Sequence, residues 1–186
     1  SQPHGITAAS DGNLWVAESS GSRIARITPG GEIAEFPLPA GSGPAHTVQG
    51  ADGSIWFTES GTHRIGRMSL AGQLLAEYPL PTQKTNLNGI AYSPDGRQLA
   101  LADYEHVRIL EAATGKELAL LQPDGPFSAV AYQPDGRRLA AASLDQTVRI
   151  WGTDGKLLHV LAGHEAEVTS VAFRSDGQAL ASRSEE

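Results

Sequence analysis

The sequence contains no cysteine, so disulfides, thiolate catalysis and thiolate metal ligands are all excluded. It also contains no run of about 18 apolar residues, the length that a membrane-spanning helix needs, and no signal-peptide pattern opens it. Positive charge is scarce, since 14 Lys and Arg stand against 21 Asp and Glu and form no cluster. Because nucleic acids and anionic membranes are bound through concentrated positive charge, we expect neither as a partner. The compartment stays open.

Turn-forming residues are abundant, with 21 Gly and 11 Pro among 186 residues, and they recur at a fixed period. An Asp-Gly pair begins at five places separated by 40 to 43 residues: Asp11, Asp52, Asp95, Asp135 and Asp176. A second glycine follows the same steps in four units: Gly31, Gly72, Gly115 and Gly155. Two markers that lengthen and shorten together indicate a structural repeat of about 40 residues.

Each period contains four short apolar segments separated by turns. In the fourth unit these segments are residues 128–133, 137–143, 147–151 and 156–162. The Asp-Gly pairs supply the positive φ that tight hairpins require, and a period near 40 with four strands is typical of a propeller blade. The sequence therefore predicts an all-β fold: a β-propeller segment of four complete four-stranded blades plus half a blade, forming an open arc or fragment.

We expect one propeller segment over residues 1–186, because the spacing between units leaves no room for a domain linker. The expected blades are residues 1–42, 43–85, 86–125 and 126–165, followed by a half-blade at 166–186. The last unit has only two of its four strands, so its outer edge would be unpaired. We therefore expect that the chain does not close into a ring by itself, and that it self-associates through open blade edges.

The segment AVAYQPDGRRLAAASLDQTVRIW and its neighbours, roughly residues 87–186, resemble the WD-repeat family. In that family a His, a Ser or Thr, an Asp and a Trp form a hydrogen-bonded structural network within each blade. The places of this network are matched by Ser143, Asp145 and Trp151 in the fourth unit, and by His164 and Ser184 in the fifth. The network is complete in no blade, because the His place of the fourth unit falls on Pro123 and the Asp place of the fifth on Glu186. The resemblance implies recognition of a protein or peptide.

The segments PHGITAASDGNLWVAE and DGSIWFTES, within roughly residues 3–81, resemble the streptogramin B lyase family. The resemblance implies that a His at the start of the first strand in each of two adjacent blades, with a Glu two residues before one of them, works with a magnesium ion. His4 matches the first His, but the equivalent place one blade later is Ala45, and Gly43 stands in the Glu place. His46 is displaced by one residue, which turns it to the other side of the strand. We therefore expect no metal and no cofactor.

The start of the first strand, the end of the second strand and the turn that follows share one edge of each blade, because these strands are antiparallel. His and Glu side chains at such an edge can bind a divalent metal or act as an acid–base pair. The alternative is that Glu18 and Glu59 form salt bridges to Arg23 and Arg64, and that the turn histidines are simply exposed. The predicted binding residues at this edge are His4, Glu18, His46, Glu59, His63, Tyr104, Glu105, His106, Leu144 and Gln146.

No phosphate-binding glycine loop, serine nucleophile motif, zinc-ligand spacing or catalytic carboxylate pair is present. The main hypothesis from sequence is therefore a non-catalytic propeller scaffold for protein or peptide interaction. The alternative is a C–O lyase or a small-ligand binder that uses the first two blades, as the streptogramin B lyase resemblance implies.

Overall fold

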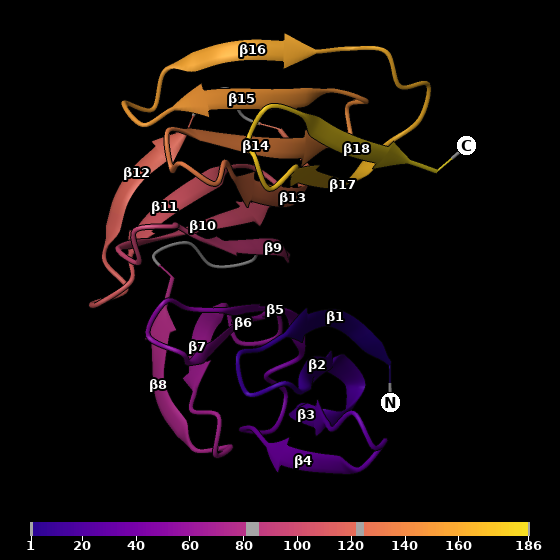
Figure 1. Ribbon diagram of the computed structural model, residues 1–186, viewed down its shortest axis with the longest axis vertical. Helices are drawn as coiled ribbons and strands as arrows, with labels where there is room; N and C mark the ends of the chain where they lie inside the picture. The colour runs from indigo at the N-terminus through magenta and orange to yellow at the C-terminus, as the bar shows by residue number, and fades with distance from the viewer. Residues whose placement is uncertain (1, 81–85, 122–124, 186) are drawn as a thin grey trace. The chain divides into compact units, whose positions relative to one another are not determined.

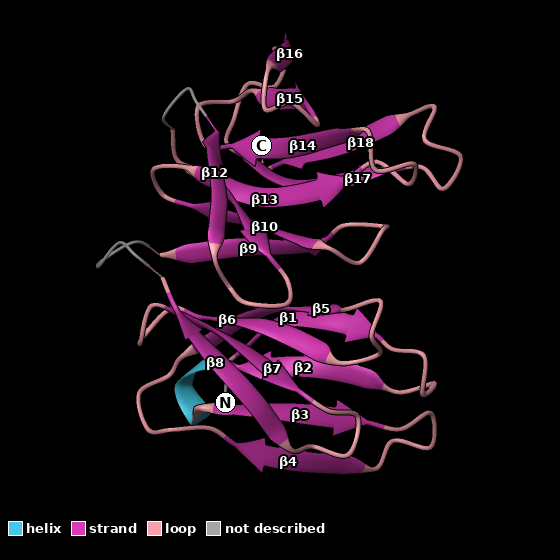
Figure 2. Ribbon diagram, turned by 90° about the vertical axis from the view of Figure 1, so that its left-hand side faces the viewer, coloured by secondary structure: helices cyan, strands magenta, loops and turns pink. Residues whose placement is uncertain are grey.

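The computed structural model describes residues 2–80, 86–121 and 125–185, and the chain is almost entirely antiparallel β-sheet (Figure 1). Four sheets contain four strands each and a fifth contains two. The single helical element among the described residues is the short 3-10 turn η1 (Ser19–Gly21), drawn in cyan in Figure 2. No helix in this part of the chain is long and apolar enough to cross a membrane. The predicted fold class, four complete propeller blades plus half a blade, is confirmed.

Contacts between Cα atoms divide the chain into two compact units, residues 1–87 and 88–186. The first unit holds two blades, each a meander of neighbouring strands. Blade 1 consists of β1 (Pro3–Ala8), β2 (Leu14–Glu18), β3 (Arg23–Ile27) and β4 (Ile33–Pro37). Blade 2 consists of β5 (Pro44–Gln49), β6 (Ile55–Glu59), β7 (Arg64–Met68) and β8 (Leu74–Pro79).

The second unit holds two further blades and the half-blade. Blade 3 consists of β9 (Leu87–Tyr92), which begins at the unit boundary, β10 (Gln98–Asp103), β11 (Val107–Glu111) and β12 (Glu117–Leu121). Blade 4 consists of β13 (Phe127–Tyr132), β14 (Arg138–Ser143), β15 (Val148–Gly152) and β16 (Leu157–Leu161). The half-blade pairs β17 (Val168–Phe173) with β18 (Leu180–Ser184).

The Asp-Gly markers lie in the turn between the first and second strand of all five blades, as predicted. Their glycines have φ between 70° and 79°, the region that residues with a side chain rarely adopt. Alternate residues of the inner strands face the two neighbouring blades, so both faces are apolar. In unit 1 one face of β2, with Trp15 and Ala17, packs against Ile55 and Phe57 of β6.

Parts of the predicted WD-type hydrogen-bond network are present in blade 4 and in the half-blade. The Ser143 hydroxyl donates to the Pro126 carbonyl at 3.2 Å and accepts the Asp145 backbone N–H at 3.3 Å. Trp151 is fully buried and lies edge-on to Phe127, with ring centroids 5.9 Å apart. Participation of Trp151 in the Ser143–Asp145 network stays a prediction.

In the half-blade, the His164 ring nitrogens lie 2.9 Å from Ser184 Oγ and 2.7 Å from Ser182 Oγ. This is the His-to-Ser step that the network pattern predicts, made between the segment before β17 and strand β18. Pro123 and Glu186, the two departures from the pattern, lie outside the described residues.

Candidate functional site

The candidate site lies at one edge of the two blades of unit 1, where the first strands begin and the second strands end. Pro3 pairs with Glu18 in blade 1, and Pro44 pairs with Glu59 in blade 2. Both pairs are followed by a register shift, so each first strand enters its sheet irregularly at this edge. This arrangement places an imidazole and a carboxylate at the same edge of each blade, as the sequence predicts.

Strands β1 and β5 approach each other closely at this edge. A Cβ atom at Gly5 would lie 2.6 Å from His46 Cα, so glycine is required there for the backbones to come together. Two residues further along, Thr7 Oγ1 donates to the Thr47 carbonyl at 2.7 Å, and Thr47 Oγ1 donates to the Trp15 carbonyl at 3.3 Å. These contacts hold the two first strands side by side and bring His4 and His46 close together.

His4 and His46 differ in their surroundings. His4 is exposed, whereas His46 is half-buried and its Nδ1 atom is fully buried. Burial lowers the pKa of His46 to about 4, with a smaller contribution from the neighbouring charge of His4. His46 is therefore neutral at pH 7, and its buried Nδ1 makes no hydrogen bond with the residues that the structure describes. Because this nitrogen is buried, it is not exposed to a bound molecule in the structure.

The two glutamates of the edge are held inside their own blades. Glu18 lies 3.1 Å from Arg23 Nε, which is the expected salt bridge. The expected pair between Glu59 and Arg64 is replaced by another, because Arg64 Nη1 lies 3.6 Å from the Glu77 carboxylate.

Glu59 is completely buried and accepts a hydrogen bond of 2.6 Å from Thr62 Oγ1. Burial, together with the nearby Glu77 carboxylate, raises the pKa of Glu59. Glu77 was not among the residues predicted for this edge from the sequence. A usable signal was present, since the pattern Ala-Glu-aromatic-Pro occurs in both blades, at residues 34–37 and 76–79.

The residues at this edge do not fit a magnesium ion. Among the described residues no group of three His, Asp or Glu side chains could hold a metal. Magnesium prefers oxygen ligands, whereas His46 offers one buried nitrogen. Gly43, which stands in the predicted Glu place, has φ of 55°, and a Cβ there would lie 3.3 Å from the Gly61 nitrogen. A glutamate at this position would be strained.

The remaining predicted binding residues lie in turns. His63, in the turn after β6, has φ of 54°, and its carbonyl accepts the Leu80 N–H at 3.0 Å. In unit 2, the turns after β10 and β14 carry Tyr104, Glu105, His106, Leu144 and Gln146. His106 Nδ1 lies 3.8 Å from the buried Asp103 carboxylate, which ties that turn to its own blade. No contact within the described part of the chain brings these turn residues into a common site, and their role in binding stays a prediction.

The blades and their paired imidazoles belong to a recognisable class of β-propeller. The model of the virginiamycin B lyase family matches residues 1–180, so the chain belongs to that family. It is 32% identical over 103 residues to a virginiamycin B lyase of Nocardia farcinica, an alignment that covers 50% of this chain and 33% of the relative. It is 42% identical over 45 residues to a virginiamycin B lyase of Bordetella pertussis, covering 24% and 15% of the two chains.

Solved structures agree with this assignment. A catalytically inactive variant of Staphylococcus aureus virginiamycin B lyase with quinupristin superposes with a TM-score of 0.86 at 26% identity, covering 98% of this chain and 62% of the other. A streptogramin B lyase structure gives 0.82 at 28% identity, covering 94% and 60%. The chain therefore spans less than two thirds of the length of these relatives.

The family match corrects the main hypothesis from sequence. A non-catalytic WD-type scaffold for protein or peptide interaction is contradicted, because the lyase family extends through the half that resembles WD repeats. The physical reason is that the Asp-Gly hairpins and the small apolar second strands, which carried the WD resemblance, are needed by any blade packed between two others. The alternative, a streptogramin-lyase-like reading, is favoured.

Proposed function

We propose that this chain is part of a C–O lyase propeller that acts on a cyclic antibiotic of the streptogramin B class. The observation that carries the proposal is the match of the virginiamycin B lyase family to residues 1–180. Relatives named virginiamycin B lyase, and a related structure with quinupristin, support the choice of ligand class. In this proposal the edge formed by β1 and β5 contributes to binding.

The chemistry of the edge is compatible with this role. A C–O lyase removes a proton from the carbon next to the one that bears the oxygen while the C–O bond breaks, so it needs a base near the ligand. His4 is the exposed imidazole of the pair and can exchange a proton with a bound molecule. His46 stands at the same edge and is neutral at pH 7, so it adds no positive charge beside the bound molecule.

Magnesium chemistry is not assigned to this edge. Gly43 and Ala45 supply no ligand side chain, and the described residues form no three-ligand group. The role we propose for the edge is therefore binding and proton exchange by imidazole.

Binding of quinupristin to the 186-residue chain, measured by calorimetry, tests the proposal. We expect His4→Ala and His46→Gln each to weaken binding about fivefold or more, because each removes one imidazole from the edge. His159→Ala is the matched control, since His159 is exposed on β16 in the other unit, and it should leave binding unchanged. Chromatography of the ligand after incubation tests ring opening. Absence of binding by the unsubstituted chain, or equal binding by all three variants, would contradict the proposal.

A further inference from the structure

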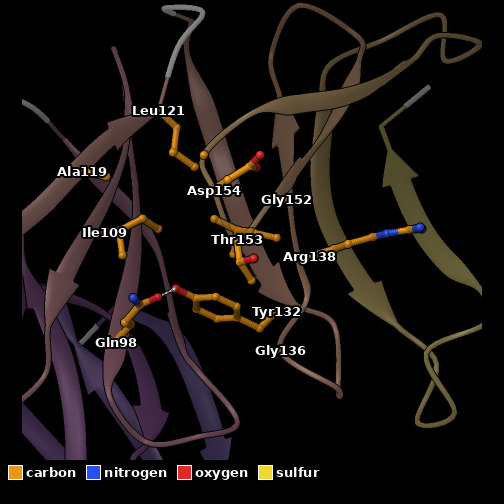
Figure 3. Close-up of a pocket in the computed structure, with 12 residues that line it drawn as sticks. Gln98, Ile109, Ala119, Leu121, Tyr132, Gly136, Arg138, Gly152, Thr153 and Asp154 are labelled. Carbon is orange, nitrogen blue, oxygen red and sulfur yellow. Dashed lines mark hydrogen bonds between the residues drawn. The ribbon is translucent and has the colours of Figure 1, made fainter.

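A pocket lies within unit 2, between blades 3 and 4. It has a volume of about 130 Å³. One wall is formed by Ile109, Ala119 and Leu121 of blade 3, and Leu139 of blade 4 also lines the pocket. Figure 3 shows Tyr132 and Thr153 within the pocket, whereas Arg138 extends away from it. The pocket opens beside two turns of blade 4, the turn between β13 and β14 and the turn between β15 and β16. These turns lie at the end of the blade where its first strand ends, opposite to the end where the first strand begins.

The pocket exists because blade 3 lacks the large side chains that blade 1 carries at the same places. In blade 1, Trp15 stands three residues before the end of its strand and pairs with Arg26. In blade 3, Ala100 stands three residues before the end of its strand and pairs with Ile109. Like Trp15, Ala100 is fully buried against the following blade.

On the fourth strand, too, blade 3 carries a smaller side chain than blade 1. Phe36 pairs with Ile24 in blade 1, and the corresponding partner of Val107 in blade 3 is Leu121. Blade 3 thus has Ala, Ile and Leu where blade 1 has Trp, Arg and Phe.

Unit 1 shows what fits between two such blades. The rings of Trp15 and Phe36 stack with centroids 5.5 Å apart, and the Arg26 guanidinium lies 5.9 Å from the Trp15 ring. The Trp15 ring nitrogen donates to Asp11 in the adjacent turn at 3.3 Å. A cavity of ~150 Å³ lined by aliphatic side chains holds benzene, and the pocket of unit 2, at about 130 Å³ and open at its mouth, is of similar size.

Polar groups surround the mouth of the pocket. A hollow that contains Asp95 and Asp135 shares Gln98, Tyr132 and Thr153 with the pocket. The Tyr132 hydroxyl donates to Gln98 Oε1 at 3.4 Å (Figure 3). Burial raises the pKa of Tyr132 well above its usual range, with a further contribution from the negative charge of Asp95, which places that carboxylate near the pocket.

Asp95 occupies the same turn in blade 3 that Asp11 occupies in blade 1. Its Oδ1 accepts Ser93 Oγ at 2.7 Å and the Arg97 N–H at 3.1 Å. The Asp95 side chain is exposed in the hollow beside the pocket, where its carboxylate can accept a further hydrogen bond.

We propose that the pocket binds a small aromatic molecule that carries an N–H donor, of the indole or arylamine class. The ring occupies the space between Ile109, Leu121 and Leu139, and the N–H donates to Asp95, as Trp15 donates to Asp11. The acidic mouth disfavours ligands with a carboxylate. This site belongs to the other unit and is independent of the proposed lyase function.

Indole is the probe for the first experiment, and its binding to the full chain is measured by ligand-observed and amide-detected NMR. We expect millimolar or tighter binding, and a loss of at least about tenfold in Leu121→Phe, where the added ring fills the pocket as Phe36 does in blade 1. Leu120→Phe is the matched control, because Leu120 is the adjacent residue of β12 but faces outward with 38% of its surface exposed. Ala119→Leu, which also narrows the pocket, replaces Leu121→Phe if that variant does not fold.

A second comparison tests the role of Asp95. Benzothiophene has the shape of indole but no N–H, so the unsubstituted chain should prefer indole several-fold. Asp95→Asn should remove this preference, and indole-3-acetate should bind more weakly than indole to the unsubstituted chain. Absence of indole binding at about 10 mM, or binding that the pocket-filling variants leave unchanged, would overturn the proposal.

Discussion

Arg108 and Asp103 form an ion pair inside blade 3, with Arg108 Nε 2.9 Å from Asp103 Oδ2 and at most 2% of either side chain exposed. Arg108 Nη1 also lies 2.6 Å from Glu117 Oε2, so one guanidinium joins β11 to the end of β10 and to β12. The Asp103 carboxylate accepts the backbone N–H groups of Glu105 and His106 as well. This network fixes the turn that leads from β10 into β11.

Removal of one partner from this pair should be costly. Asp103→Ala leaves the Arg108 charge buried without its main counter-ion, and we expect the free energy of unfolding to fall by about 3–5 kcal/mol. Urea unfolding measures this change. The exposed pair of Arg174 and Asp176 provides the control, since water already screens this pair and Asp176→Ala should cost much less than Asp103→Ala. Similar effects of the two substitutions would show that burial of the pair is not what matters.

Gly5 should tolerate no side chain. In Gly5→Ala the new Cβ would lie 2.6 Å from His46 Cα, a backbone atom, so the strands must separate. We expect a loss of about 1–3 kcal/mol in stability, measured by thermal or urea unfolding. Gly30→Ala is the matched control, because the nearest atom to a Cβ there is the Thr28 hydroxyl oxygen at 3.7 Å. A neutral Gly5→Ala would mean that β1 and β5 are not closely packed.

The buried His46 should make stability depend on pH. Its pKa falls from 6.5 to about 4 on folding, so between these values the unfolded chain binds more protons than the folded chain. The contribution of the neutral His46 to the free energy of unfolding is therefore fully present above pH 6.5. It falls as the pH drops toward 4, by roughly 2–3 kcal/mol.

Unfolding free energies at pH 7 and pH 4.5, compared between the unsubstituted chain and His46→Gln, isolate this contribution. The substitution should make the pH dependence shallower, while titration of carboxylates affects both chains equally. Parallel pH profiles would show that His46 is protonated as readily in the folded chain as in the unfolded chain.

Asp145 should act as a structural residue of blade 4. Its carboxylate accepts the Thr147 N–H at 3.0 Å and the Thr147 hydroxyl at 2.6 Å, and it also binds Arg149. We expect Asp145→Ala to lower stability by about 1–3 kcal/mol in thermal unfolding. Asp135→Ala, whose side chain accepts the Arg137 N–H, should cost less. Unchanged unfolding of Asp145→Ala would contradict a structural role for this turn.

Self-association of the 186-residue chain stays a prediction and can be tested directly. Among the described residues, β18 pairs only with β17, and β16 forms an edge of its sheet with Val160 and Leu161 exposed at 52% and 43%. Unpaired strand edges with apolar side chains favour association between molecules. We expect sedimentation to depend on protein concentration and Val160→Lys to reduce this dependence. A monomer at every concentration would instead favour a chain that closes on itself.

The strands could be predicted from sequence because their turns are set locally. The Asp-Gly pairs specify hairpins through a glycine at positive φ, as at Gly12 and Gly53, and no distant residue needs to be known. The salt bridge between Glu18 and Arg23 was predictable for the same reason, since the two residues flank one turn.

The rest of the site depends on partners that sequence spacing does not reveal. Arg64 pairs with Glu77 instead of Glu59 because the fourth strand returns beside the third, in a register that is set by sheet pairing. The pKa of His46 depends on burial against another blade. The functional hypothesis was wrong where it relied on features that WD and lyase blades share.

The placement of the three tryptophans gives each unit its own optical reporter. Trp15 and Trp56 lie in unit 1, where each ring stacks on an aromatic partner and lies beneath an arginine. Trp151 lies in unit 2, edge-on to Phe127. In repeat architectures each unit contributes its own stability and neighbours add to it, so the fluorescence of single-tryptophan chains would follow the melting of the two halves separately. The degree to which the two signals coincide is then a direct measure of cooperativity along the chain.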